Sequence, residues 1–387
     1  MKPFTLFYAF LSALLYLLAL IPLLWLTLKP KYKKSIPARF FLRNNPPFRQ
    51  RGIWFHVCSL GEARALKPVL ELVEQYPVNI TVITQTGYSE SKKYKADVRY
   101  LPYETFLPFW ITPQPLLVVL EAEFWYLLFA TARAKGAKVV LLNARMTEKS
   151  YPKYRRLKWF YSRLFERVDK IFCQSEADKQ RFESLGAGNI EVVGNIKLAQ
   201  KITATALYDK PEGEVIVAAS THDGEEAAIL KAFLNYRRER PSKLIIVPRH
   251  PERFEAVWKL VTGSCKEMNF SRWSDVKTFD ADIILIDAMG ELNNMYAIGD
   301  IAILGGAFRD DVGGHNPLEP AHFGCKIITG KHAYMQQELF KYVSHVQEVE
   351  TDAIEDALLR CAKMEPSRIM EQIDLERVVD YLKENYS

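Results

Sequence analysis

The sequence lacks the residue patterns that cross-link small domains through sulfur or a metal. Its five cysteines lie far apart and form no CxxC pair, which argues against a disulfide framework or a zinc ribbon. Its seven histidines show no HExxH motif and no paired-ligand spacing, so a structural metal is not expected. No repeat or low-complexity segment is evident. With 387 residues, 49% of them hydrophobic, and a net charge of +6, the chain has room for two globular domains in a reducing compartment.

Charge is also missing from the N-terminal segment 4–28. This segment exceeds the roughly 20 apolar residues that a helix needs to cross a bilayer. Four lysines follow between residues 29 and 34, so the positive-inside rule places the rest of the chain in the cytoplasm. We therefore predict a transmembrane anchor over 1–29. A cleaved signal peptide is the less favoured alternative, because no small residues stand before the lysines.

Short apolar runs then alternate with helical stretches in two successive series. The expected strands are 53–58, 79–84, 116–120, 138–142, 170–173 and 190–193, followed by 215–219, 243–247, 283–287, 301–304 and 326–329. A linker is predicted at 203–214. The alternation predicts an α/β protein with two doubly wound domains facing one another, an N-terminal one over 30–207 and a C-terminal one over 208–387. The last predicted helix, 365–383, is free to pack back on the N-terminal domain.

The segment 149–170 is both basic and aromatic. A solvated helix face is the simplest interpretation. Nucleic-acid binding is a second one, but no supporting motif accompanies it. Beside a membrane anchor, contact with anionic lipid headgroups is favoured, because basic and aromatic side chains prefer the membrane interface.

The stretch 305–321 carries the strongest local pattern. Glycines that permit close approach of a ligand follow an apolar run, and Asn316 can cap a helix whose first residue would be Pro317. Glu319 then falls in the first turn, near N–H groups that could bind an anion. The pattern is typical of a site for a phosphorylated sugar or a nucleotide. The alternative is that Asn316 and Glu319 form only a capping box.

Carboxylates follow the strands of the first series. Ser59 and Glu62 have the S-x-x-E spacing of a capping box, but Glu62 is also placed to act as a general base at the carboxyl edge of the sheet. Glu121 and Glu123 follow the third strand and would share a face if extended. Lys197 could balance negative charge nearby.

The second series places cationic and small residues after its strands. Arg249 and His250 precede Pro251, so they lie just before an expected helix N-terminus, where arginine is a natural phosphate clamp. Gly290 permits backbone approach by a base or ribose. Each loop is weak evidence by itself, and several at one edge of a sheet are stronger.

In this order, the motifs resemble those of the 3-deoxy-D-manno-oct-2-ulosonic acid (Kdo) transferases, membrane-anchored glycosyltransferases of the GT-B architecture. The resemblance covers nearly the whole chain. Besides the anchor, it rests on Ser59 to Glu62, Glu121 to Trp125, Asn143 to Arg145, Gly194 to Lys197, Ser220 to His222, Arg249 to Arg253, Met289 to Leu292 and Gly313 to Ala321. The last of these is the most specific.

The resemblance implies CMP-Kdo as donor, the lipid A precursor lipid IVA as acceptor, inversion without a metal or other cofactor, and no nucleic-acid partner. It implies an inner-membrane protein with its catalytic domains on the cytoplasmic side, in contact with membrane lipids. Glu62 matches the general base, and Glu123 (or Glu121) and Lys197 match positions that stabilise the transition state. The implied CMP-binding residues are Arg249, His250, Met289, Gly290, Glu291, Leu292, Asn316, Pro317, Leu318 and Glu319.

The sequence departs from the family pattern beside Glu123, where Ala122, Phe124 and Tyr126 replace the usual Thr, Leu and Pro, and at Ala199, where Asp is usual. Two other functions stay open at this stage. One is a GT-B enzyme with a UDP-sugar donor, and the other is a membrane-tethered nucleotide-sugar binder in which Glu62 is only a cap.

Overall fold

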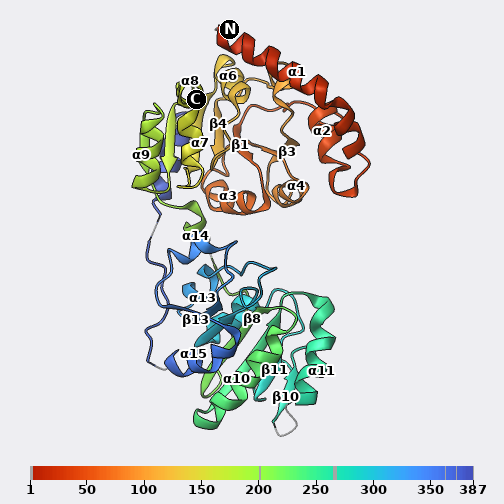
Figure 1. Ribbon diagram of the computed structural model, residues 1–387, viewed down its shortest axis with the longest axis vertical. Helices are drawn as coiled ribbons and strands as arrows, with labels where there is room; N and C mark the ends of the chain where they lie inside the picture. The colour runs from red at the N-terminus through yellow and green to blue at the C-terminus, as the bar shows by residue number, and fades with distance from the viewer. Residues whose placement is uncertain (1–2, 200–201, 265–267, 362, 372, 387) are drawn as a thin grey trace. The chain divides into compact units, whose positions relative to one another are not determined.

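The computed structural model describes residues 3–199, 202–264, 268–361, 363–371 and 373–386, and it divides the chain into two compact units (Figure 1). Unit 1 comprises residues 1–200 and 372–387, and unit 2 comprises residues 201–371. The division falls at 200/201, seven residues before the predicted 207/208 boundary. The C-terminal segment returns to unit 1, so both termini belong to that unit.

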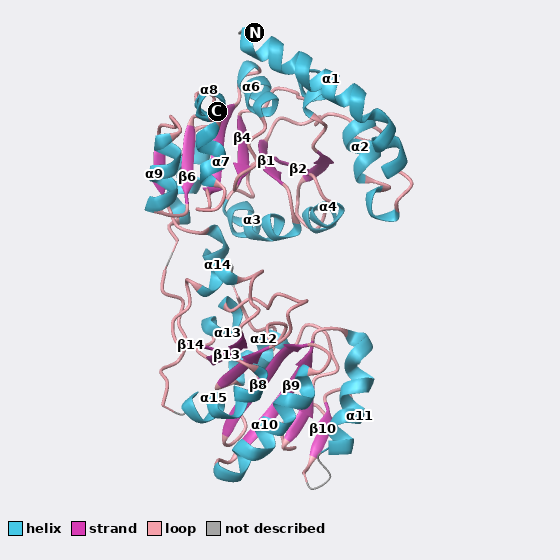
Figure 2. Ribbon diagram, viewed as in Figure 1, coloured by secondary structure: helices cyan, strands magenta, loops and turns pink. Residues whose placement is uncertain are grey.

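Unit 1 is built on a seven-stranded parallel sheet with strand order β3-β2-β1-β4-β5-β6-β7 (Figure 2). Its strands are β1 (Ile53–Val57), β2 (Val78–Val82), β3 (Asp97–Tyr100), β4 (Leu116–Leu120), β5 (Lys138–Ala144), β6 (Lys170–Cys173) and β7 (Ile190–Val192). The six predicted strands are present and end within two residues of the predicted positions. The strand β3 was missed because it lies at an edge and only alternate residues are buried, so it has no continuous apolar run.

Helices and short 3₁₀ turns connect these strands. They are α1 (Pro3–Leu26), η1 (Pro30–Tyr32), α2 (Ser35–Phe41), α3 (Leu60–Leu72), α4 (Gln85–Ser91), η2 (Glu104–Phe106), α5 (Leu107–Trp110), α6 (Tyr126–Ala134), α7 (Tyr151–Arg156), α8 (Lys158–Phe165), α9 (Glu176–Ser184), η3 (Ile196–Ala199) and α16 (Leu375–Glu384). In the described part of the chain, α1 alone is long and apolar enough to cross a membrane, judged by length and composition.

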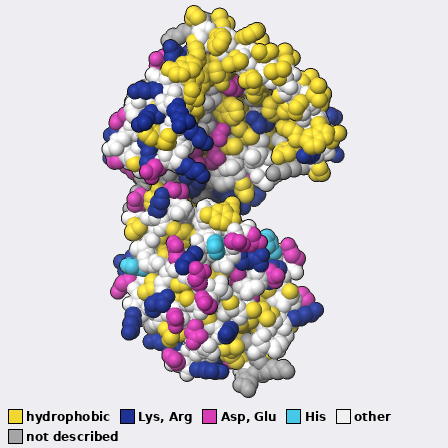
Figure 3. Space-filling view, viewed as in Figure 1, with side chains coloured by type: hydrophobic (Ala, Val, Ile, Leu, Met, Phe, Trp, Pro, Cys, Tyr) yellow, Lys and Arg dark blue, Asp and Glu magenta, His cyan; other side chains and the backbone are white. Residues whose placement is uncertain are grey.

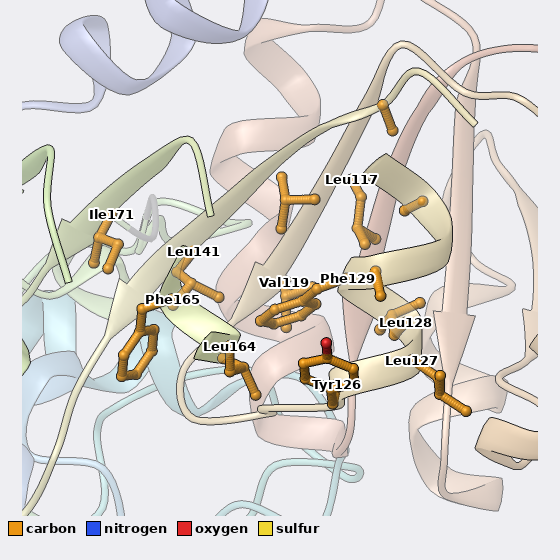
Figure 4. Close-up of a cluster of buried hydrophobic side chains, with 14 of the residues drawn as sticks. Leu117, Val119, Tyr126, Leu127, Leu128, Phe129, Leu141, Leu164, Phe165 and Ile171 are labelled. Carbon is orange, nitrogen blue, oxygen red and sulfur yellow. The ribbon is translucent and has the colours of Figure 1, made fainter. Parts of the chain in front are cut away.

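The core of unit 1 lies on both faces of its sheet. Strands such as β4 are buried at every position, because helices cover both faces of a parallel sheet. On one face, Leu117 and Val119 of β4 pack with Phe129 of α6 and Leu164 of α8 (Figure 4). On the other face, the sheet packs against α3 and α16, which explains why the C-terminal helix belongs to this unit.

Unit 2 repeats the architecture with a second seven-stranded parallel sheet, in the order β10-β11-β9-β8-β12-β13-β14. Its strands are β8 (Glu214–Thr221), β9 (Ser242–Pro248), β10 (Phe270–Arg272), β11 (Ile283–Leu285), β12 (Ile301–Leu304), β13 (Lys326–Gly330) and β14 (Val346–Val349). The five predicted strands are confirmed within two residues. The two missed strands, β10 and β14, are again short edge strands, and most of their residues are only partly buried.

The helices of unit 2 are mostly short. They are α10 (Glu225–Glu239), η4 (Pro251–Arg253), α11 (Phe254–Ser264), α12 (Leu292–Ile298), α13 (Leu318–His322), α14 (Gln337–Phe340), η5 (Thr351–Ala353) and α15 (Ile354–Cys361). Two apolar clusters, one on each face of the sheet, form its core.

The predicted C-terminal helix over 365–383 is correct only in its second half, where α16 (Leu375–Glu384) lies. Most of the first half runs extended. The amide of Met370 donates to the carbonyl of Tyr342, and the amide of Ser344 donates to the carbonyl of Arg368. This backbone therefore forms hydrogen bonds with the segment 342–344 instead of within a helix. Because that segment is distant in the sequence, the local residue pattern could not predict this pairing.

Candidate active site

Glu62 lies in the first turn of α3, directly after β1. Its Oε2 accepts a hydrogen bond from the Cys58 amide at 2.8 Å, and its Oε1 accepts one from the Ser59 hydroxyl at 2.8 Å. Ser59 in turn caps the helix by accepting from the Glu62 amide at 3.3 Å. Ser59 is thus the N-cap that the spacing predicts, but the Glu62 carboxylate accepts from the amide of Cys58 rather than from that of Ser59, and these bonds hold it at the carboxyl edge of the sheet.

The Glu62 carboxyl is also tuned towards proton acceptance. The residue is 8% exposed, and this burial raises its pKa to about 7. The hydrogen bonds from Cys58 and Ser59 lower the pKa, and the charges of Glu121 and Glu123 raise it further. A carboxylate whose pKa lies near neutral pH is well suited to act as a general base. A carboxylate that only caps a helix gains nothing from a raised pKa.

Glu121 and Glu123 do not share a face as an extended backbone would require. Glu121 has a left-handed φ of 57° and forms ion pairs with Lys197 at 2.9 Å and Arg145 at 3.3 Å. Glu123 instead accepts a hydrogen bond from the Trp125 indole at 2.8 Å. Lys197 is thus paired with Glu121, and the two carboxylates have separate partners.

Arg39 of α2 is a residue of this site that the sequence analysis missed. Burial lowers the pKa of its guanidinium, while Cys58 and Glu123 act in the opposite direction, which places Arg39 close to both. It also donates to the Leu101 carbonyl at 3.0 Å. Burial and the neighbouring charge of Glu123 raise the pKa of the Cys58 thiol to about 12, so the thiol stays protonated. Arg39 stands in the connector before β1, where no local motif marks it.

At the carboxyl edge of the unit 2 sheet, three histidines come together. The rings of His222 and His315 stack with centroids 5.1 Å apart, and their Nε2 atoms lie 2.9 Å from each other. His250 contacts His222 edge-on at 5.6 Å. A bond between two Nε2 atoms requires one ring to donate and the other to accept, so at least one ring is neutral.

Burial and surrounding cations depress the basicity of these rings. Burial, then the charges of His222 and Arg249, lower the pKa of His315 to about 4. The pKa of His222 is lowered by burial and then by His250 and Arg249. Arg249 itself is exposed, and no ion pair of its guanidinium is recorded among the described residues. The edge therefore offers unneutralised positive charge to an anion.

The loops that carry these groups are tied together by Glu225. Its carboxylate accepts from the amide of His222 at 2.9 Å and from the amide of Gly306 at 2.8 Å. Gly305 has to be glycine, because a Cβ there would lie 2.8 Å from both the Glu225 carboxylate and the Ser220 carbonyl. The turn after β12 thus packs directly on the turn after β8.

The predicted helix start at Asn316 is displaced by one residue. Helix α13 begins at Leu318, so Pro317 precedes the helix rather than opening it. Asn316 Oδ1 accepts from the Leu318 amide at 3.0 Å, and its amide group donates to Glu319 at 3.4 Å. Asn316 therefore holds the first turn from the position before the N-cap, which is Pro317, and the anion-binding role expected from the sequence stays a prediction.

The loop after β11 presents the remaining predicted residues. Met289 is 65% exposed, and Gly290 adopts the left-handed φ of 91° that its loop needs. Glu291 accepts hydrogen bonds from the Tyr208 hydroxyl at 3.1 Å and from Asn294 at 2.7 Å. Leu292 begins α12. Glu291 therefore has structural partners of its own within unit 2.

Two findings limit what the site can hold and where a ligand can bind. Among the described residues, no group of three or more His, Cys, Asp or Glu side chains is arranged to hold a metal ion. A cavity of about 910 Å³ in unit 2, lined by Gly213, Ser242 and Asp282, lies at the starts of β8, β9 and β11. Ligands of α/β sheets bind at the opposite, carboxyl edge, so this cavity is not the donor site.

Comparison with known proteins gives the assignment. The family model of the 3-deoxy-D-manno-octulosonic-acid transferases matches residues 34–200. A 3-deoxy-D-manno-octulosonic acid transferase of Haemophilus influenzae is 32% identical, covering 86% of this chain and 84% of its own. This chain belongs to that family. It is a glycosyltransferase.

A second relative and a solved structure agree with this membership. The 3-deoxy-D-manno-octulosonic acid transferase of Chlamydophila psittaci is 30% identical, covering 80% of this chain and 76% of its own. The solved glycosyltransferase of kitacinnamycin is similar in fold, with a TM-score of 0.51 and 10% identity over 87% of this chain and all of its own. The chain therefore has the GT-B fold.

Proposed function

We propose that this enzyme transfers Kdo from CMP-Kdo to a hydroxyl group of lipid IVA, with inversion at the anomeric carbon and with Glu62 as general base. The observation that carries the proposal is the buried Glu62 carboxylate with its pKa of about 7, held at the carboxyl edge of unit 1 by Cys58 and Ser59. The family membership supports Kdo as the transferred sugar.

In the proposed step, a hydroxyl oxygen of the acceptor attacks C2 of Kdo. The new C–O bond forms as the bond between C2 and the phosphate oxygen breaks, and CMP leaves with the electron pair. Glu62 takes the hydroxyl proton. Such a base contributes about 10² to 10⁴-fold to the rate, and the hydrogen bonds that cap α3 would also hold the base in position.

The other residues of unit 1 support this step electrostatically. Lys197 and Arg145 neutralise Glu121, so one of the three acids at this edge is already compensated. Arg39 lies near Glu123 and adds a partly buried positive charge. We assign Lys197 and Glu123 to stabilising the charged transition state of the bound sugar, as the resemblance implies.

The charged groups of unit 2 match the leaving group. Arg249 offers an exposed guanidinium, and the neutral pair His222 and His315 can gain a proton when an anion approaches. Positive side chains at this edge could stabilise the phosphate of CMP without a metal, because a monophosphate carries less charge than a diphosphate. Exposed loop residues such as Met289 and Gly290 would contact the nucleoside.

A lipid acceptor requires the enzyme to work at a membrane. We propose that it acts at the cytoplasmic face of the inner membrane, attached through α1. The lysines after residue 28 and the apolar composition of α1 support this location.

One assay tests the proposal. The purified full-length enzyme should convert CMP-Kdo and detergent-dispersed lipid IVA into a Kdo-bearing lipid, detected by mass spectrometry. Activity should persist in EDTA, and UDP-sugars should not replace CMP-Kdo. Turnover with a UDP-sugar, or CMP-Kdo binding without any turnover, would contradict the proposed reaction.

A further inference from the structure

The long apolar helix α1 is polar along one stripe. Four of its side chains follow one another at intervals of three or four residues, which places them on a single helix face. They are Thr5, Tyr8, Ser12 and Tyr16. Each of the four makes a hydrogen-bonding contact with a group elsewhere in unit 1, so the stripe is the docking face of the helix.

The N-terminal half of the stripe contacts the elements around α6. Thr5 Oγ1 lies 3.0 Å from the Tyr126 hydroxyl. The Tyr8 hydroxyl donates to Glu104 Oε2 at 2.7 Å, and the other oxygen of Glu104 accepts from the Leu127 amide at 2.7 Å. Because Glu104 is only 6% exposed, it depends on these partners. Tyr126 and Leu127 directly follow the loop that carries Glu123.

The middle and the C-terminal part of the stripe also form hydrogen bonds with the rest of unit 1. Ser12 is 4% exposed, and its hydroxyl lies 3.0 Å from that of Thr105. The Tyr16 hydroxyl donates to the Phe40 carbonyl of α2 at 2.7 Å. The helix is therefore docked on unit 1 over at least residues 5–16.

The opposite face of α1 is apolar and uncovered. Its side chains form a continuous band along the helix in the space-filling view, where hydrophobic atoms gather over α1 (Figure 3). Those at least half exposed are Leu6, Phe7, Phe10, Leu15, Leu17, Leu18, Ile21, Leu24 and Trp25. A band of this size on the surface of a protein marks a protein or membrane interface.

Positive charge borders this band at both ends of the helix. Near the N-terminal end, a cavity of about 590 Å³ is lined by Phe4 and by three cationic residues and one acidic residue, Lys158, Arg163, Arg167 and Glu166. At the C-terminal end, a second cavity of about 910 Å³ is lined by Leu24 and four cationic residues, Lys33, Lys34, Arg43 and Arg99. Cations around an apolar band match the anionic headgroups of a membrane surface.

A helix crossing the bilayer does not fit these contacts. Helix α1 is about 36 Å long at 1.5 Å per residue, so in a spanning orientation its ends would lie at opposite faces of the membrane. Here Thr5 in the first turn and Leu23 in the last turn are both buried against the rest of the chain. If α1 crossed the membrane alone, Thr5, Tyr8 and Ser12 would lie in hydrocarbon without their hydrogen-bonding partners. If those contacts were kept, Arg163 and Arg167 of unit 1 would have to enter the hydrocarbon with the helix.

We propose that α1 is an in-plane anchor, which lies parallel to the membrane with its apolar face in one leaflet and its polar stripe on unit 1. This replaces the transmembrane orientation expected from hydropathy alone. The occupant of the band is the lipid leaflet, and the cations at both ends contact headgroups of the same membrane face. The inference does not depend on which sugar the enzyme transfers.

A topology measurement tests the orientation directly. The full-length chain carries one epitope tag at its N-terminus and another at its C-terminus, and inverted inner-membrane vesicles from expressing cells are treated with protease. An in-plane anchor leaves both tags accessible from outside. Protection of the N-terminal tag until detergent opens the vesicles would show a spanning helix and overturn the proposal, as would absence of the protein from the membrane fraction.

A matched pair of variants tests the face of the helix. Leu17→Asp charges the exposed band, while Leu72→Asp makes the same change at an exposed leucine of α3. Binding to phosphatidylethanolamine–phosphatidylglycerol vesicles should fall about tenfold or more in the first variant and stay unchanged in the second. Equal binding by both variants would refute lipid contact through this face. Because the readout is vesicle binding rather than turnover, the result stands whatever donor the enzyme uses.

Discussion

The two units have the same seven-stranded architecture but carry different titratable groups at the carboxyl edges of their sheets. In unit 1 the strand β1 leads to Glu62, and β4 leads to Glu121 and Glu123. In unit 2 the strand β8 leads to His222, and β9 leads to Arg249 and His250. The fold supplies the same edge twice, and in the proposed function the side chains after each strand decide whether it would take up a proton or bind an anion.

Burial perturbs the pKa values at both edges, but with opposite consequences. At Glu62 burial raises the pKa, which favours the neutral acid and makes the carboxylate a stronger base. At His315 burial lowers the pKa, which favours the neutral imidazole. A neutral ring can accept a proton when an anion binds beside it. Under the proposed function, this difference would suit the edge of unit 1 to the acceptor hydroxyl and the edge of unit 2 to the leaving group.

The largest effect should come from Glu62→Gln. Glutamine can still occupy the capping box, but it cannot take a proton, so kcat should fall by about 10² or more while the free energy of unfolding changes by at most about 1 kcal/mol. Glu71→Gln, at an exposed position of the same helix, is the control. Retention of more than about a tenth of wild-type kcat, with chemistry rate-limiting, would assign the base to Glu121 or Glu123.

The pH dependence of wild-type activity tests the role of Glu62 without a substitution. The base must be deprotonated, so kcat/KM should rise with pH through a midpoint near the Glu62 pKa of about 7 and then level off. In steady-state assays, a flat profile across neutral pH would contradict Glu62 as the titrating base.

His315 should make unit 2 sensitive to acid. Its pKa falls from 6.5 in the unfolded chain to about 4 in the folded one, so the unfolded chain binds more protons between these values. Stability contributed by the neutral ring is present above pH 6.5 and is lost as the pH falls, by up to about 3 kcal/mol. Denaturant unfolding at several pH values should show a shallower acid slope for His315→Gln, but not for His322→Gln, which alters an exposed histidine.

Arg249→Ala should weaken CMP binding by roughly 1–3 kcal/mol, the range for losing a charged hydrogen bond. Arg238→Ala, which removes an exposed arginine near the end of α10, should leave the affinity unchanged. Isothermal calorimetry with CMP measures both. Unchanged affinity in the Arg249 variant would move the phosphate site away from this edge.

Ser59→Ala should give the smallest effect. Loss of the N-cap should lower the free energy of unfolding by about 1 kcal/mol. Because the Ser59 hydroxyl lowers the Glu62 pKa, its removal should shift the midpoint of the kcat/KM profile to higher pH. A midpoint that stays in place would show that Ser59 acts only as a cap.

The sequence predicted the sheet strands where burial on both faces leaves a continuous apolar run, as in β4 and β12. It failed at β3, β10 and β14, whose edge positions require fewer apolar residues. It also placed Glu62 and Arg249 at carboxyl edges, because a residue that follows a parallel strand has little choice of position. The hydrogen-bonding and ion-pair partners of these residues could not be predicted from the local sequence.

Local pattern therefore determined the fold class, the two series of strands and the residues at their ends. Tertiary structure alone decided that His222 meets His315 across 93 positions, that Lys197 pairs with Glu121, and that Arg39 joins the site. It also decided that α1 docks through a polar stripe. Hydropathy averages over all faces of a helix, whereas docking depends on one face and on partners that only the folded chain brings together.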